Sequence, residues 1–135
     1  MLIRPERPKV FIKKLNKELR LDFVTIADEE WIRERYPNNS YLNNIKDGSV
    51  DTALDMFWHF IDDDSKKIVA SSTIKKWEGM KEVEVQVDDP IEKLKYIVSG
   101  ADEMKSILEA LFTNGERSNP VPEETEKKKK LAASP

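Results

Sequence analysis

The only histidine of the chain, His59, is the residue best suited to acid–base or metal chemistry, and it lies in an acidic stretch. If that stretch is helical, Asp55 and Asp63 lie four residues to either side of it, on the same face. A catalytic or metal site would need further ligands, or a pocket around the imidazole. One imidazole between two carboxylates on a polar arc favours a solvated, ion-paired histidine instead.

Three adjacent carboxylates, Asp62, Asp63 and Asp64, could hold a divalent cation, but the wider ligand spacing and the glycine of a calcium loop are missing. Acidic residues are unfavourable at the end of a helix and favourable at the start of the next one. We therefore expect a cap and a turn here. Asp64 or Ser65 would then cap a second helix in KKIVASS.

The three tryptophans of the chain, Trp31, Trp58 and Trp77, could stack on bases or bind a ligand. Each has apolar neighbours at helical spacing, which is typical of side chains that pack in a core. We therefore expect all three to stabilise the core rather than to form a binding site.

Basic residues alternate with apolar ones between Arg4 and Arg20, so the outer face of a hairpin there could contact RNA. The net charge of -3 gives no overall basic field that would favour nucleic acid. A solvated strand face is the simpler interpretation. A small nucleic-acid-binding regulator, using this hairpin and the lysine-rich segment 127–130, is the alternative function that we consider.

The composition limits the other chemistry that is available. The chain has 135 residues and no cysteine, which excludes disulfides, thiol catalysis and cysteine-based zinc sites. No P-loop, nucleophile elbow or histidine–glutamate zinc motif occurs. No apolar run approaches the roughly 18 residues of a membrane span, and MLIRPERPKV lacks the apolar region of a signal peptide. We expect a soluble, non-enzymatic protein without catalytic residues, cofactor or metal.

The segment that should position these side chains is VDTALDMFWHFIDDDS, from Val50 to Ser65. Its apolar residues recur at i, i+3, i+4, i+7, i+8 and i+11, the spacing of one helix face. Ser49 or Asp51 can cap this helix, and Asp51, Asp55 and His59 form its polar arc. We expect it to be the centre of the core, whose anchors are Leu54, Phe57, Trp58, Ile61, Leu94 and Leu108.

The remaining elements should cover this helix. Period-2 runs in KVFIKKL and ELRLDF predict a β-hairpin that turns at Asn16-Lys17, and EVEVQV (82–87) predicts a third strand that could pair with it. Further helices are indicated by a capping box at 25–28, by a cap and proline at 88–90, and by an apolar stripe that ends at Asn114-Gly115. The predicted fold is α+β, mainly α, with the N-terminal hairpin packed on a small helical bundle.

The length of the chain favours a single domain. We place it at residues 9–115, after an irregular lead-in at residues 1–8 that contains two prolines. Residues 116–135 are charged and contain proline, and their only apolar residues are Val121, Leu131, Ala132 and Ala133. This composition predicts a disordered tail.

Three segments in order, KVFIKKLNKELRLDF, FWHFIDDDSK and DDPIEKLKYIVSGADEMKSILEALF, resemble the tail assembly chaperones of long-tailed, siphovirus-type bacteriophages. The resemblance covers Val10 to Phe112 in hydrophobic rhythm rather than in invariant motifs. It implies a non-enzymatic protein of the host cytoplasm that binds the tape measure protein, keeps it soluble and is absent from the finished virion. Self-association is left open, and neither a membrane nor nucleic acid is an expected partner.

Four consecutive lysines, Lys127, Lys128, Lys129 and Lys130, are consistent with a solvated basic end that aids solubility. The family resemblance adds a second interpretation, because such phages often make a longer form by a programmed ribosomal frameshift near the end of the gene. Lysine codons can supply the adenine-rich run on which a ribosome slips. The longer form would then carry a second segment that helps recruit the tail tube protein.

Overall fold

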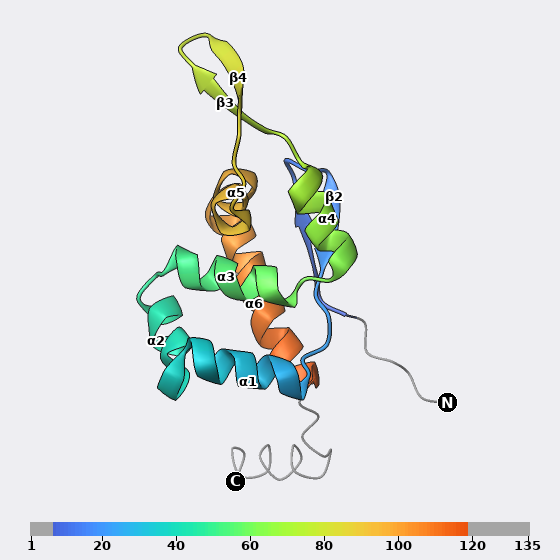
Figure 1. Cartoon of the computed structure of the whole chain (residues 1–135), viewed down its shortest axis with the longest axis vertical. Coiled ribbons are helices and arrows are strands. Elements are labelled where there is room, and N and C mark those ends of the chain that lie inside the picture. Colours follow the sequence, from blue (N-terminus) through green and yellow to red (C-terminus); the bar gives the residue numbers. More distant parts are fainter. Residues whose placement is uncertain (1–6, 119–135) are drawn as a thin grey trace, which may run out of the picture.

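The computed structural model describes residues 7–118, with side chains described as far as Asn114 (Figure 1). The fold is α+β and mainly helical, as predicted, with two separate two-stranded antiparallel sheets in the described part of the chain. The elements, in order, are β1 (Lys9–Ile12), β2 (Lys17–Arg20), α1 (Ile26–Arg35), the 3-10 turn η1 (Pro37–Asn39), α2 (Ser40–Lys46), α3 (Val50–Phe60), α4 (Asp63–Ser71), β3 (Ile74–Glu78), β4 (Lys81–Val85), α5 (Pro90–Ile97) and α6 (Gly100–Ser118).

The N-terminal hairpin, β1–β2, packs its inner face on the helices, as predicted. Val10 pairs with Leu19, and these two side chains and Ile12 are buried. The turn occupies 13–16 rather than Asn16-Lys17, and Asn16 takes the left-handed backbone conformation that asparagine tolerates well. The hairpin thus closes one side of the core with two short strands.

Helix α3 lies near the centre of the molecule, with α5 above it and α1 below it in the view of Figure 1, and with the N-terminal hairpin and α4 beside it. It begins at its cap Ser49, whose Oγ accepts a hydrogen bond from the Thr52 amide at 3.3 Å. It ends at Phe60, earlier than the predicted stop at the aspartates, because Ile61 becomes extended and pairs with Leu21 across a β-bridge. Ile61 is therefore buried through a strand-like contact and not on the helix face.

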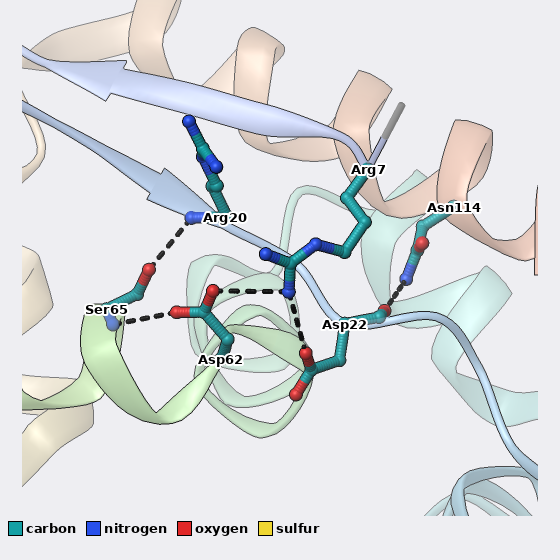
Figure 2. A network of polar contacts seen from close by, with 6 residues as sticks. All are labelled: Arg7, Arg20, Asp22, Asp62, Ser65 and Asn114. Carbon is teal, nitrogen blue, oxygen red and sulfur yellow. Dashed lines mark hydrogen bonds and ion pairs between the residues drawn. The ribbon is translucent and has the colours of Figure 1, made fainter. Parts of the chain in front are cut away.

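Helix α4 is capped by Asp62, so the predicted cap at Asp64 or Ser65 is wrong. The Ser65 amide donates to Asp62 Oδ1 at 2.8 Å, while Ser65 Oγ accepts from the Arg20 amide at 2.8 Å (Figure 2). Arg7 Nη1 lies 3.3 Å from Asp62 Oδ2 and 3.0 Å from Asp22 Oδ1. This network ties the start of α4 to the N-terminal hairpin.

The second hairpin, β3–β4, projects from the domain in Figure 1 and contacts the core only near its base. The prediction of a third strand beside the N-terminal hairpin is wrong, because β4 pairs with β3, from Ile74↔Val85 to Glu78↔Lys81. Gly79, with φ +63°, takes the first loop position and Met80 the second, an arrangement typical of a type II′ turn. We call this element the arm.

The core contains four of the six expected anchors as fully buried side chains: Leu54, Phe57, Ile61 and Leu94. The other two, Trp58 and Leu108, are half-buried. Val50, expected to begin the buried face of α3, is 45% exposed because the helix has only just started there.

Helix α6 runs to Ser118, so the predicted end at Asn114-Gly115 is wrong. Asn114 is almost completely buried, and its Nδ2 donates to the Asp22 carbonyl at 2.7 Å (Figure 2). A glycine inside a helix costs only about 1 kcal/mol, which does not force the helix to end.

Residues 1–6 and 119–135 lie outside the described residues, and so do the predicted tail from 119 onward and Lys127–Lys130. Within the described part, no helix is long and apolar enough to cross a membrane.

Candidate binding surfaces

The polar arc of α3 forms ion pairs with side chains of other helices. Asp55 and His59 are partly covered there, although the sequence predicted a solvated arc, whereas Asp51 stays exposed as predicted. Asp51 pairs with Lys95 of α5, Asp55 with Arg35 at the end of α1, and His59 with Asp28 in the first turn of α1. The prediction that His59 pairs with Asp55 and Asp63 is therefore wrong. His59 does not pair with the carboxylates four residues away, because the tertiary fold places Asp28, which is distant in the sequence, next to its ring.

His59 is held in place on two sides. Its Nε2 lies 2.9 Å from Asp28 Oδ1, and its ring stacks on Trp31 with the centroids 3.7 Å apart and the planes 5° from parallel. Asp28 Oδ2 in turn accepts hydrogen bonds from the amide and the hydroxyl of Thr25, at 2.8 and 3.0 Å. Both carboxylate oxygens are thus engaged, so this pair acts as a clamp between α1 and α3.

The electrostatics of Asp28 agree with that role. Desolvation is the largest single influence and raises the pKa of its carboxyl, but hydrogen bonds from Thr25 and His59 together outweigh it. As a result, the pKa of the Asp28 carboxyl lies below its ordinary value. The charged carboxylate is therefore the form that stabilises the start of α1.

A second polar contact holds the other end of α1. Arg35 Nε and Nη2 donate to the two oxygens of Asp55 at 2.9 and 3.2 Å, and the Tyr36 hydroxyl donates to Asp55 Oδ2 at 2.6 Å. Burial, followed by the hydrogen bond to Asp55, raises the pKa of Tyr36. Helix α1 thus attaches to α3 through two polar clamps and the Trp31 stack.

Among the residues that the structure describes, no group of three His, Asp or Glu side chains could hold a metal ion.

Helix α6 presents two different stripes. Glu103, Ile107, Ala110 and Asn114 are buried, and Glu103 accepts hydrogen bonds from the amides of Lys13 at 3.2 Å and Ser99 at 2.8 Å. The neighbouring stripe, at i, i+4 and i+8, consists of Met104 and Leu108, which are half-buried, and Phe112, which is 46% exposed. We call these three residues the outer stripe of α6. It is an apolar helix face that the domain covers only in part.

The arm carries two strongly exposed large apolar side chains near its tip. Met80 in the turn is 99% exposed, and Trp77 on β3 is 65% exposed. The prediction that Trp77 packs in the core is therefore wrong, whereas Trp31 and Trp58 pack partly against the core. The missed signal is Gly79-Met80 between two short extended runs, a pattern typical of a tight hairpin.

A recess of about 180 Å³ lies at the base of the arm. Its lining includes side chains of α3, α4 and α5 and of the segment after β4: Trp58, Val69, Ala70, Val87, Pro90 and Lys93. The Lys93 amine donates to the Ala70 carbonyl at 2.7 Å, so the cation is tied to the end of α4. The recess is thus mainly apolar. Its polar lining residues are Lys93, held by this hydrogen bond, and Gln86 and Asp88, which are hydrogen-bonded to each other.

Comparison with known proteins finds no matching family model, no curated protein and no solved structure.

Proposed function

We propose that this chain is a tail assembly chaperone of a long-tailed bacteriophage, which binds the tape measure protein in the host cytoplasm and keeps it soluble. The observation that carries the proposal is the outer stripe of α6, Met104, Leu108 and Phe112, a partly covered apolar face at helical spacing. Such a face suits an amphipathic helix of a client, whose own apolar stripe would complete its burial. The identity of the client comes from the sequence resemblance.

The energetics of this surface suit a chaperone that must later leave. Full burial of a large apolar side chain contributes about 1.5 to 3 kcal/mol, and the outer stripe has three that are already partly covered. One copy would therefore bind a client helix weakly. Several copies along one long client would hold it collectively, and tail tube subunits could displace them one by one.

The test is co-expression of the tape measure protein with this chain. The native chain should keep the client soluble, and Leu108→Ser combined with Phe112→Ser should lose that effect while unfolding at nearly the native temperature. Leu42→Ser is the matched control, because Leu42 is similarly exposed but lies on α2. If the native chain leaves the client insoluble, the proposed function is wrong; if the double variant still rescues it, the outer stripe is the wrong surface.

A second candidate, the nucleic-acid-binding regulator, is favoured by one observation. Phe11 is 50% exposed on the outer face of β1, on which Lys9 also lies, so an aromatic ring could stack on a base beside a cation. However, Lys9 lies 3.5 Å from Glu18, and Lys14 donates to the Tyr96 carbonyl. Binding to single-stranded RNA that weakens steeply with salt and is lost in Phe11→Ser would reverse our ranking.

The proposed longer form is tested on the messenger sequence. A slippery adenine-rich run across the codons of Lys127–Lys130, with an overlapping open frame downstream, would support a frameshifted product that recruits the tail tube protein. A chaperone linked in this way would raise the effective concentration of tube subunits near the tape measure protein. Without such a run, the four lysines are best explained as a solvated basic end.

A further inference from the structure

We propose that the tip of the arm of one copy, formed by Trp77 and Met80, docks into the recess at the base of the arm of a second copy. The tip is a projecting apolar feature, with Met80 99% and Trp77 65% exposed. The recess is a mainly apolar hollow of about 180 Å³ on the same chain. An apolar side chain from the tip could fill the recess, and the recess could shield that side chain from water.

The size of the recess decides what kind of group it could take. Sites for small molecules and cofactors usually have at least roughly 300 Å³, whereas a cavity of about 150 Å³ already accepts a benzene ring. At about 180 Å³ the recess suits one side chain. Methionine is well adapted to such a site, because it is flexible and its sulfur interacts favourably with aromatic rings such as that of Trp58.

The tip and the recess of one copy cannot meet within the same molecule. Gln86, Val87 and Asp88 line the recess and directly follow β4, so the recess lies at the base of the arm. Met80 lies five residues before the end of β4, which places the tip about 17 Å along the hairpin from that base. The paired strands point away from the domain in Figure 1. Only another molecule can bring a tip to this recess.

Both surfaces carry charges of both signs. Glu78 and Lys81 flank the turn at the tip, as a cross-strand pair. At the recess, Asp88 is one of the lining residues, and the Lys66 amine lies 5.9 Å from the ring centroid of Trp58. In the proposed contact, Glu78 can pair with Lys66 and Lys81 with Asp88, so the two surfaces are complementary in charge.

The contact joins two different surfaces, and we expect it to form head-to-tail, without the reciprocal contact that would close a two-fold dimer. Each copy keeps a free tip or a free recess after pairing, and rows of copies can grow. A contact made by one tip is small, and small interfaces are weak and transient. We therefore expect association that increases with protein concentration. This inference uses surfaces other than the outer stripe of α6 and does not depend on the proposed function.

The experiment is sedimentation velocity on the full chain over a range of concentrations, with two variants designed to complement each other. Met80→Ser removes the tip and keeps a residue that suits the turn. Ala70→Gln places a longer side chain in the recess, from an exposed helical position. Circular dichroism and thermal unfolding check that both variants fold, and Leu42→Ser is the control for an exposed apolar residue elsewhere.

The native chain should form species larger than a dimer, and each variant alone should lose them. A mixture of the two variants should give dimers and nothing larger, because one partner supplies the only intact recess and the other the only intact tip. The control should behave as the native chain. A native chain that stays monomeric up to its solubility limit, or that stops at a dimer, overturns the proposal. Association that persists in Met80→Ser, or a variant mixture that stays monomeric, also overturns it.

Discussion

At the scale of single residues, Asp62 shows how one carboxylate joins several segments. Its Oδ1 caps α4 and its Oδ2 lies 3.3 Å from Arg7 Nη1. Desolvation raises the pKa of Asp62. Hydrogen bonds from Ser65 and the charges of Arg7 and Arg20 lower it by more, so the pKa of Asp62 is below its ordinary value. The residue therefore contributes both as a helix cap and as a charge.

Asp62→Ala should lower the free energy of unfolding by about 1 to 2 kcal/mol, the usual cost of losing a cap, plus its ion pair. Asp63→Ala is the matched control: Asp63 is exposed and adjacent, so its loss should stay within about 0.5 kcal/mol. Denaturant unfolding at neutral pH measures both. Equal effects in the two variants would show that Asp62 does not cap α4 in solution.

The charge of Asp62 can be separated from its capping role by acid. A carboxyl whose folded pKa is depressed contributes stability above the unfolded value, near 3.9, and loses it as the pH falls through the folded value. Asp62→Asn keeps a good capping residue but cannot titrate. The native chain should therefore be more stable than this variant at pH 6, and the difference should shrink below about pH 4. A constant difference between pH 6 and pH 2 would contradict the depressed pKa.

At the scale of elements, neighbouring aromatic side chains of α3 should contribute differently to the stability of the core. Phe57 is fully buried, whereas its neighbour Trp58 is half-buried and lines the recess. Phe57→Ala should cost about 3 to 5 kcal/mol, and Trp58→Ala clearly less. Thermal unfolding of the two variants compares them directly. If Trp58→Ala is the more destabilising change, Trp58 and not Phe57 is the main aromatic anchor of the core.

The sequence predicts elements that carry their own local signal. The 3.6-residue rhythm of α3, the period-2 runs of β1 and β2 and the capping box of α1 are patterns of neighbouring residues, and the structure has all three elements. The end of α3 could not be predicted in this way. It depends on a bridge between Ile61 and Leu21, which are distant in the sequence.

Contacts between residues distant in the sequence also explain why parts of the candidate surfaces could not be predicted. His59 takes its partner from α1, and no pattern around His59 points to Asp28. In the arm, the alternation of EVEVQV predicts β4, but β3, with the sequence IKKWE, has no clear alternation that would identify it as the partner strand. Apolar residues that face solvent, such as Met80 and Phe112, look in a sequence like any other core residue.

At the scale of the whole molecule, one buried amide joins the two ends of the described chain. Asn114 Nδ2 donates to the Asp22 carbonyl at 2.7 Å, and Asp22 also pairs with Arg7 (Figure 2). Asn114→Ala should lower the free energy of unfolding by about 1 to 3 kcal/mol, because a carbonyl loses its partner. Thr113→Ala, at the adjacent and less buried position, is the control. An unfolding midpoint equal to that of the native chain would show that the contact contributes little.

The attachment of α1 determines how the native state fluctuates. None of the side chains of α1 is fully buried, and Ile26 at its start is 75% exposed. Segments with little buried surface open locally at a small fraction of the global free energy. The amides of α1 should therefore exchange with deuterium long before those of α3, in openings that leave the core intact. Each such opening would separate Trp31 from His59 and briefly expose an aromatic surface on the central helix to water.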